Sequence, residues 1–501
     1  MPRDVGPMAD PTEEVAVPDR LSSLDATFLY LEQPTTVMHV GSVMILQPGP
    51  TGFDVDRVLR YIQSRIAYVP RYRQRLRSVP GRMSNPVWVD DEHFDLSYHV
   101  RRSALPRPGT EEQLAELVAR LQGRRLDRRR PLWEVYLVEG LTGGRFAVVT
   151  KVHQAMVDGV HAVDVGQVLL TDEPDGHVPP PDTWNPAPEP STAELIAGAV
   201  VDSIRRPGEV VDALLSGAGE VGRTALRTAR GVGSLVLRAR APATTPGPLT
   251  GGVSEHRRFA MVATDLADYR KIRNHLTRPP RRRGASALAV NGSDELSATA
   301  TINDVVLATL AGALRAWLMT RGLAQPPGAV VRTLVPMSVR AEDPRSAGAI
   351  GSRVASLLVD LPTGEGSPLI RLHHIVYQTK AHRETGQAVG APAIAGIAGF
   401  APPTLHSLGA RVATGLSRRL FHLVVTNVPG PQHPMYLDGA QLLSSYPMVP
   451  LTVGQVLSVG VTSYDGGVYY GLNADRDAMP DVDVFGHCIL DALTELLETV
   501  R

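Results

Sequence analysis

One stretch constrains this chain more than any other, because it combines a strand, a polar turn and a helix. It covers residues 145–170 and reads RFAVVTKVHQAMVDGVHAVDVGQVLL. The run from Phe146 to Val152 is apolar and β-branched, and it has the length of a strand. After the pair Asp158–Gly159, apolar residues recur with mostly helical spacing. His153 and Gln154 therefore follow a strand directly, on a loop held by rigid elements, where functional side chains concentrate.

Strand-length and helix-length patterns follow one another along the chain, which predicts an α/β (α+β) fold of mixed β-sheets flanked by helices. At 501 residues the chain is too long for one ordinary domain. Two breaks rich in proline or glycine, at residues 171–190 and 241–252, predict where it divides. We expect a disordered N-terminus, an N-terminal subdomain, a proline-rich linker with amphipathic helices, and a C-terminal subdomain, at residues 1–20, 21–175, 176–255 and 256–501.

The composition argues against several classes of protein. The formal net charge is zero, which gives no reason to expect a nucleic-acid partner. The single cysteine, Cys488, excludes an internal disulfide and a cysteine-based metal cluster, and it fits a reducing compartment. We interpret it as an inert thiol on the buried side of a C-terminal helix. Residues 1–20 lack the apolar segment of a secretory signal, and residues 385–410 are broken by prolines, so we predict no membrane span.

The region after the linker leaves a question about membranes open. Two or three helical patterns lie between residues 192 and 240, and the last of them carries four arginines among apolar residues: Arg223, Arg227, Arg230 and Arg238. An amphipathic helix of this kind can lie on an anionic membrane surface. The alternative is a helix packed on the protein with its arginines in water. We therefore expect a cytoplasmic protein, with peripheral contact to a membrane or lipid droplet as an open hypothesis.

Residues 153–159 resemble a known catalytic motif. The heptapeptide His153-Gln154-Ala155-Met156-Val157-Asp158-Gly159 is similar to the HHxxxDG motif of bacterial wax ester synthases/diacylglycerol acyltransferases (WS/DGAT), which belong to the chloramphenicol-acetyltransferase-like CoA-dependent acyltransferases. Further segments match motifs of that family in the same order: residues 21–46, Pro131-Leu132-Trp133-Glu134, Asn303-Asp304-Val305-Val306 and Thr426-Asn427-Val428-Pro429-Gly430-Pro431. The resemblance spans roughly residues 21–500, and we interpret the chain as an actinobacterial, mycobacterial-type paralogue.

The resemblance implies a fold and a reaction. The fold would be two chloramphenicol-acetyltransferase-like subdomains with a substrate tunnel at their interface. The reaction would be transfer of an acyl group from acyl-CoA, as co-substrate, to diacylglycerol or a long-chain alcohol, in triacylglycerol or wax ester synthesis, with no bound cofactor and no metal. In the family, the aspartate that corresponds to Asp158 holds the loop through an arginine, and the glycine that corresponds to Gly159 keeps the channel clear.

Four further residues are assigned to the substrate and acyl-CoA channel by the resemblance: Asn303, Asp304, Ser338 and Asn427. Asn303 would lie on the acyl-donor side. The plain physical alternative for the Asn303–Asp304 pair is the cap of a buried helix. Ser352 stands where the family usually has asparagine, which is one departure from its pattern.

The more serious departure is Gln154, which occupies the position of the family's general base. An alcohol needs a base to remove its proton, and an amide has no usable basicity. Three interpretations follow. His153 could serve as the base, which would require a local bulge, because adjacent side chains of a strand point to opposite faces. The protein could be a slow acyltransferase. It could also be a paralogue that has left catalysis and binds acyl chains or a partner.

Several other polar residues carry weaker predictions. His39 could line a site or be a structural histidine. Trp133 is most simply a core residue, and Glu134 could pair with an arginine near Asp158. The basic segment at residues 71–82 is predicted to be a solvated face.

Overall fold

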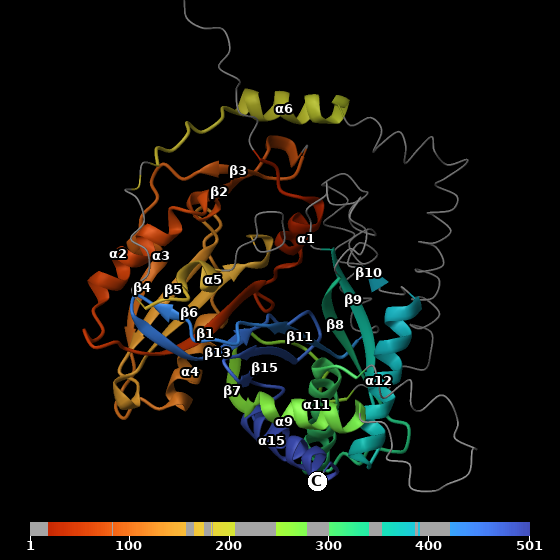
Figure 1. Cartoon of the computed structure of the whole chain (residues 1–501). Coiled ribbons are helices and arrows are strands. Elements are labelled where there is room, and N and C mark those ends of the chain that lie inside the picture. The colour runs from red at the N-terminus through yellow and green to blue at the C-terminus, as the bar shows by residue number, and fades with distance from the viewer. Residues whose placement is uncertain are drawn as a thin grey trace, which may run out of the picture.

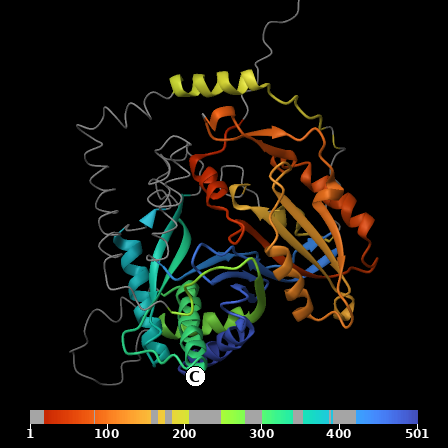
Figure 2. The same cartoon turned by 180° about the vertical axis from the view of Figure 1, so that it is seen from behind.

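The computed structural model describes residues 19–82, 84–156, 165–174, 182, 184–205, 247–277, 300–339, 353–385, 389–390 and 421–500. These parts form a six-stranded sheet, a seven-stranded sheet and a small two-stranded hairpin, with helices around them (Figures 1 and 2). Several predictions fall outside these ranges: the N-terminal segment 1–18, Asp158, Gly159, Ser352, the arginine-bearing helix at 223–238 and most of residues 385–410.

The six-stranded sheet carries the strand that precedes the motif. Its order is β12-β13-β1-β6-β5-β4, with the bounds Tyr436–Leu437, Ala440–Met448, His39–Gln47, Phe146–His153, Trp133–Glu139 and Val100–Ala104. β5 and β6 form a hairpin through the turn Thr142–Gly144. Helices α1 (Ser23–Leu31), α2 (Val55–Ile66) and α5 (Val165–Leu169) pack on one face, and α4 (Glu111–Gln122) packs on the other.

The seven-stranded sheet makes up the C-terminal half. Its order is β10-β9-β8-β11-β14-β15-β7, with the bounds Val389–Gly390, Arg353–Leu361, Val331–Val339, Leu423–Pro429, Leu457–Tyr464, Gly467–Asp475 and Arg257–Asp265. Its main core lies against four helices: α9 (Leu266–Thr277), α11 (Ile302–Thr320), α12 (Pro368–Thr385) and α15 (Val482–Glu498).

Helix α11 is the centre of that core. Among the described helices it is long and apolar enough to cross a membrane by composition, but 72% of this apolar stretch is buried inside the protein. Thr301 caps it, and the Thr301 hydroxyl and the Asp304 carboxylate each accept from the other's backbone N–H. The structure therefore shows the cap of a buried helix that was the plain physical alternative for this region, with Asp304 taking part in the cap.

Two strands cross from the C-terminal half into the first sheet. β12 and β13 lie between β11 and β14 of the second sheet in sequence, yet β13 pairs antiparallel with β1. β13 also lies on β14 and β15, where Pro447 faces Gly460 and Gly471. A Cβ atom on Gly471 would stand 1.9 Å from the Pro447 oxygen, and one on Gly460 would stand 2.7 Å from the Pro447 Cβ. The two halves thus meet through a strand that only glycine neighbours can accommodate.

The small hairpin holds the described part of the linker. Its strands are β2 (Gln74–Arg77) and β3 (Val87–Asp90), and the 3₁₀ turn η2 (Pro80–Arg82) lies between them. The 3₁₀ turn η1 (Pro70–Arg73) precedes the hairpin, and α3 (Leu96–His99) follows it. Arg73 pairs with Asp182 of the linker and is only 4% exposed, so the prediction of a solvated face is wrong at this residue. Its acidic partner lies 109 residues further along the chain, where no local pattern could reveal it.

The linker leads into α6 (Thr192–Arg205), which stands at the top of Figure 1.

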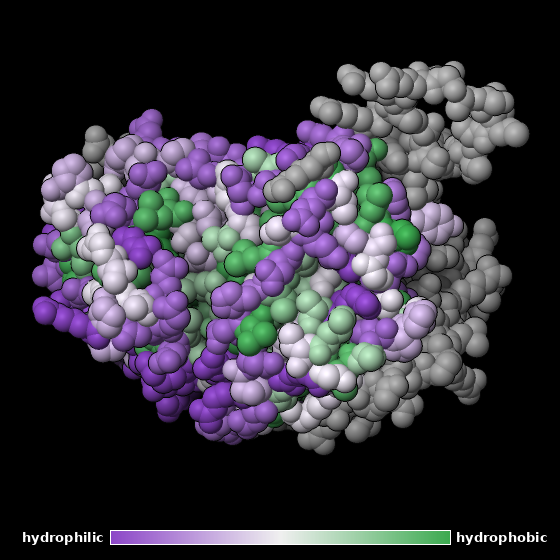
Figure 3. All heavy atoms as spheres, turned by 90° about the horizontal axis from the view of Figure 1, so that it is seen from below, coloured by the Kyte–Doolittle hydropathy of each residue, from purple (hydrophilic) through white to green (hydrophobic). Residues whose placement is uncertain are grey.

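At the opposite end, α11, α12 and α15 enclose a surface hollow of about 590 Å³, lined among others by Gly312, Met319, Arg371 and Glu495. The face seen from below shows small hydrophobic areas separated by hydrophilic residues (Figure 3). This hollow contains no residue of the His153 motif.

Candidate active site

The motif leaves strand β6 without irregularity. Pairing with β1 runs in register from Phe146 to His153, where His153 stands opposite His39. Gln154 then begins a 3₁₀ turn, η4 (Gln154–Met156), and its backbone N–H donates to the Met38 carbonyl oxygen at 2.9 Å. His153 is fully buried, whereas Gln154 is half-buried. The bulge that would turn His153 toward the position of the base is not present in this pairing.

His153 is held by a hydrogen bond to one of its two ring nitrogens, and the other faces a carboxylate. Its Nδ1 accepts a hydrogen bond from the Ala155 backbone N–H at 3.1 Å, and its Nε2 lies 4.0 Å from the Glu32 carboxylate. This arrangement assigns the proton of the neutral ring to Nε2 and leaves no free lone pair. Burial lowers the pKa of His153 to about 3, although Glu32 acts in the opposite direction. His153 is therefore a buried neutral histidine whose Nδ1 holds the start of the turn that follows β6.

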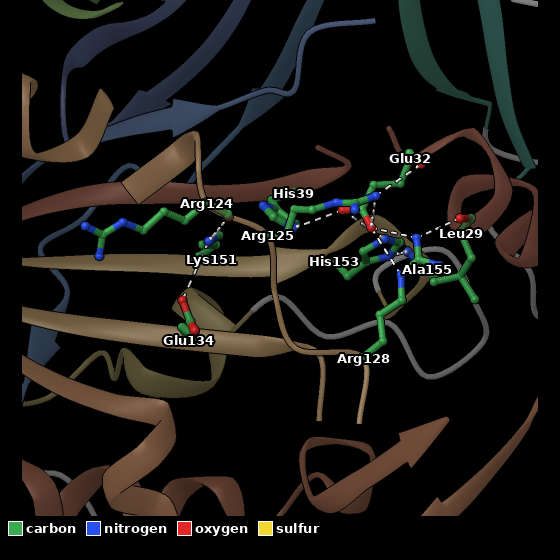
Figure 4. Close-up of polar contacts among 10 residues, drawn as sticks. All are labelled: Leu29, Glu32, His39, Arg124, Arg125, Arg128, Glu134, Lys151, His153 and Ala155. Atoms are coloured by element: carbon green, nitrogen blue, oxygen red, sulfur yellow. Dashed lines mark hydrogen bonds and ion pairs between the residues drawn. The ribbon is translucent and has the colours of Figure 1, made fainter. Parts of the chain in front are cut away.

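Glu32, at the C-terminal end of α1, is the centre of this polar cluster (Figure 4). Arg128 donates to its carboxylate from Nη2 at 2.6 Å and from Nε at 3.1 Å, and His39 Nε2 lies 3.4 Å away. The side chain of Glu32 is 2% exposed. Burial alone would raise the pKa of Glu32, but His39, His153 and Arg128 together bring it below its ordinary value. An ionised carboxylate therefore lies between two neutral histidines.

His39 is buried completely, and burial lowers its pKa to about 4, with Lys151 acting in the same direction and Glu32 against it. It therefore lines no open site in this structure. Sequence reasoning singled out His39 and His153 but missed Glu32, because the partners of Glu32 lie far along the chain and nothing local marks it.

The two buried histidines predict a stability that depends on pH. Unfolded, both titrate near pH 6.5, so below that pH the unfolded chain binds protons that the folded chain does not. The free energy of unfolding is highest above pH 6.5 and falls as the pH drops toward 4, by about 1.4 kcal/mol per histidine per unit. Urea unfolding measures how much the free energy of unfolding drops between about pH 7.5 and about pH 5.5. This drop should be smaller by about 1.4 kcal/mol in His39→Gln than in the parent. Equal pH dependence in both would contradict the assignment of a neutral His39.

A second buried ion cluster lies two residues before His153 on the same face of β6. Lys151 donates to the Arg124 carbonyl oxygen, and its Nζ lies 3.6 Å from Glu134. Burial lowers the pKa of Lys151 to about 8, with Glu134 opposing the change. Glu134 also accepts from the Tyr136 hydroxyl at 2.7 Å and lies 3.4 Å from Arg101. Its partners are thus on β4, β5 and β6, while Asp158, near which we expected an arginine partner, lies outside the described residues.

Trp133 is confirmed as a core residue, since it has no exposed surface and its indole N–H donates to the Tyr72 carbonyl oxygen at 2.7 Å. His99 stacks on Trp133 with ring centroids 4.6 Å apart. Its Nδ1 lies 2.8 Å from the Trp133 carbonyl oxygen. These contacts fix the start of β5, which lies beside the end of β6.

The structure brings two of the four predicted channel residues together. Asn427 Nδ2 donates to Asn303 Oδ1 at 3.0 Å, which joins the end of β11 to the start of α11, and both residues are half-buried. Asp304 is 1% exposed, and its carboxylate accepts from Thr301 and, at 2.7 Å, from Thr379. This is the geometry of a helix cap. Ser338 lies in β8 opposite Val354, and its side chain is outside the described set.

Within the described ranges, no group of three or more histidine, cysteine, aspartate or glutamate side chains is arranged to hold a metal ion. Cys488 is 6% exposed on α15, and burial raises the pKa of its thiol. A thiol with a raised pKa is a poor nucleophile at neutral pH, which supports the interpretation of an inert core residue.

The fold places the chain in a structural class. The first condensation domain of the calcium-dependent antibiotic synthetase superimposes with a TM-score of 0.58 at 15% sequence identity, covering 97% of this chain and 96% of the other, which speaks for the fold alone. The wax ester synthase/diacylglycerol acyltransferase from Marinobacter aquaeolei VT8 matches with a TM-score of 0.65 and 26% identity, over 96% of this chain and 99% of that one. The class is that of two-lobed, condensation-domain-like acyltransferases.

Sequence comparison then identifies the family. Residues 21–277 match the wax ester synthase/diacylglycerol acyltransferase catalytic domain, and residues 350–497 match the WS/DGAT C-terminal domain. The probable diacylglycerol O-acyltransferase tgs1 of Mycobacterium tuberculosis H37Rv is 32% identical over 96% of both chains. The probable diacylglycerol O-acyltransferase tgs3 of the same strain is 43% identical over 51% of this chain and 95% of its own length. This chain belongs to the wax ester synthase/diacylglycerol acyltransferase family.

Proposed function

We propose that the protein is an acyl-CoA-dependent O-acyltransferase that makes triacylglycerol from diacylglycerol, or wax esters from long-chain alcohols, and that Gln154 weakens this activity. The observation that carries the proposal is the family match over both domains. The relatives named above supply the substrate class, since two of them are named probable diacylglycerol O-acyltransferases. Acyl-CoA would act as a co-substrate, and the acceptor would be a lipid hydroxyl.

The weakened activity follows from the chemistry of position 154. Loss of a general base typically lowers the rate by roughly 10²–10⁴-fold. His153 offers no substitute, because its Nδ1 is occupied by the Ala155 N–H and the ring is buried. Lys151 is 1% exposed and donates to a backbone carbonyl, so it is no better placed. The amide of Gln154 can orient an acceptor hydroxyl through a hydrogen bond but cannot remove its proton.

The Asn303–Asn427 pair supports an acyl-CoA channel. Their mutual hydrogen bond uses one amide oxygen and one amide hydrogen. The half-buried pair keeps the Asn303 NH₂ group as a donor and the Asn427 oxygen as an acceptor. A secondary amide, such as those of the pantetheine arm of coenzyme A, presents the complementary acceptor and donor.

A second candidate function is favoured by Gln154 itself. A paralogue that has left catalysis would keep the tunnel and bind acyl-CoA, an acyl chain or a partner without turnover. For localisation we propose the cytoplasm with peripheral contact to a membrane or lipid droplet, because diacylglycerol and long-chain alcohols reside in such phases.

The test is the release of free coenzyme A by the purified protein supplied with a long-chain acyl-CoA, with and without diacylglycerol or a long-chain alcohol. We expect slow release that depends on the acceptor, together with labelled triacylglycerol or wax ester as product. Saturable acyl-CoA binding with no ester formed would support the non-catalytic paralogue. Release at the same rate without any acceptor would contradict both candidates, since it would indicate thioester hydrolysis.

A further inference from the structure

The loop between α4 and β5 concentrates positive charge. Residues 124–130 read RRLDRRR, which is five arginines and one aspartate, a net charge of 5 − 1 = +4 on a chain whose formal net charge is zero. Clustered charge of one sign raises the local concentration of oppositely charged ligands. The charge is therefore a property of this loop and not of the protein as a whole.

The backbone of this arginine loop (residues 124–130) is fixed from several sides. The buried Lys151 donates to the Arg124 carbonyl oxygen. The Arg129 N–H donates to the Asp127 carboxylate at 3.0 Å, and the Arg130 N–H donates to the Asp127 carbonyl oxygen at 3.1 Å. Leu126, in the middle of the loop, is buried. A ligand bound by these arginines would therefore meet a backbone that is already ordered.

Acidic side chains neutralise this region only in part. Arg128 is bound to Glu32, and Arg129 pairs with Asp127 but remains 89% exposed. Arg130 lies over the Tyr98 ring at 4.0 Å, and Arg101 of β4 lies over the same ring at 4.7 Å.

The positive groups of the region are Arg101, Arg124, Arg125, Arg128, Arg129, Arg130 and Lys151, and the acids that face them are Glu32, Asp95, Asp127 and Glu134. The balance is 7 − 4 = +3. Two guanidinium groups that share one ring, with this surplus around them, form a favourable place for anions.

The arginine loop lies beside the motif. The Leu132 carbonyl oxygen accepts the His153 N–H at 2.9 Å, and Leu132 follows the loop by two residues. Three residues of extended chain span at most about 10 Å, so Arg129 cannot be far from the end of β6. Arg128 and Arg125 reach toward Glu32, next to His153, as Figure 4 shows. A ligand anchored on the exposed arginines could therefore extend toward Gln154.

We propose that Arg129 and Arg130, with Arg101 beside them, bind the phosphate groups of acyl-CoA. This inference rests on the proposed function for the identity of the ligand. Coenzyme A carries a pyrophosphate and a 3′-phosphate, and the planar guanidinium group suits phosphate oxygens because it donates two parallel hydrogen bonds. The adjacent Tyr98 ring offers an apolar surface beside the phosphates. In this arrangement the pantetheine arm runs from the arginine loop toward residue 154.

The test compares two ligands that share the acyl-pantetheine part, of which only one carries the phosphates and the adenosine of coenzyme A. Calorimetric titration of the full-length protein with palmitoyl-CoA and with S-palmitoyl-pantetheine should be run on the parent and on the double variant Arg129→Glu/Arg130→Glu. Neither residue touches Glu32, so the polar cluster under the motif is left in place. We expect the Kd for palmitoyl-CoA to rise by about tenfold or more, and the Kd for S-palmitoyl-pantetheine to stay unchanged.

Arg102→Glu is the matched control, since Arg102 lies on β4 next to Arg101, is 66% exposed and pairs with Glu139 away from the loop. It should bind palmitoyl-CoA as the parent does. An unchanged Kd in the double variant, or an equal loss for both ligands, would overturn the proposal.

Vesicles of anionic phosphatidylglycerol test whether the arginines bind the phosphate of a lipid headgroup instead of the phosphates of acyl-CoA. If the double variant loses vesicle binding but keeps its affinity for palmitoyl-CoA, the arginine loop is a lipid-facing surface and the proposal is wrong. These measurements need no turnover, so their outcome is separate from that of the proposed function. Phosphate-dependent binding without any ester formation would support this site while contradicting the acyltransferase.

Discussion

Replacing Gln154 with histidine is expected to raise the rate of acyl transfer by roughly 100-fold or more, because it restores the general base that an alcohol acceptor needs. The backbone at residue 154 is already held in place for a histidine side chain. The backbone N–H of Gln154 is fixed on the Met38 carbonyl oxygen, and the preceding His153 is anchored through Ala155 and Glu32. An imidazole introduced there would have a pKa near neutrality unless burial lowered it, and the half-buried side chain leaves it in contact with solvent or substrate.

The measurement is the initial rate of acceptor-dependent coenzyme A release across a range of pH. The variant should gain a rate that rises with pH through the imidazole pKa, which the parent lacks. Gln154→Asn is the matched control, because it keeps an amide and adds no base, and it should remain as slow as the parent. A parent as fast as the histidine variant would mean that the base lies elsewhere.

The same comparison separates the two candidate functions. A large gain shows that substrates already bind in a productive geometry and that residue 154 alone limits the chemistry. No gain in a variant that still binds acyl-CoA would indicate that the acceptor no longer binds productively, as expected for a paralogue that has left catalysis.

The helices were predictable because their signals are local. An amphipathic pattern at residues 58–69 marks the region of α2. An Asp465–Gly466 turn signal marks the hairpin of β14 and β15, where both turn residues have positive φ. The pairing of β13 with the six-stranded sheet was not predictable, because its partner β1 lies about four hundred residues away in sequence. The packing of strands explains why Gly41, Gly460 and Gly471 carry no side chain: a Cβ atom on each would stand within 3 Å of an atom of a neighbouring strand.

The candidate site shows the same division. A motif resemblance found His153 and Gln154, but the residues that hold them came from the structure alone. Arg128 reaches Glu32 across 96 residues of sequence, and Lys151 reaches Arg124 across 27. A glutamate at the end of a helix and an arginine in a basic loop look solvated in sequence, since burial is decided by segments that pack on them from elsewhere. The hypothesis that His153 acts as base could be weighed only once its hydrogen bonds were known.

Removing the Glu32 carboxylate is expected to lower the free energy of unfolding by about 3 kcal/mol, the low end of the range for breaking a buried ion pair. The loss stays at that end because Arg128, left behind, is 44% exposed and can be hydrated. Part of it comes from the imidazoles, since His39 and His153 lose the acceptor that faces their Nε2 atoms. Urea unfolding of Glu32→Ala at neutral pH measures the effect.

Glu139→Ala provides the control, because its pair with Arg102 lies on the surface, where such pairs contribute about 0–1 kcal/mol. The two variants remove the same charge from the same half of the protein, so a larger loss for Glu32→Ala isolates the effect of burial. In the Gln154→His background, Glu32→Ala should also reduce acyl transfer, because the Glu32–Met38 loop carries the carbonyl oxygen that fixes residue 154. Equal losses in the two stability measurements would mean that Glu32 is hydrated in solution. In that case the Glu32 carboxylate would not help to hold His153 in its buried position, and the exclusion of His153 as a base would no longer hold.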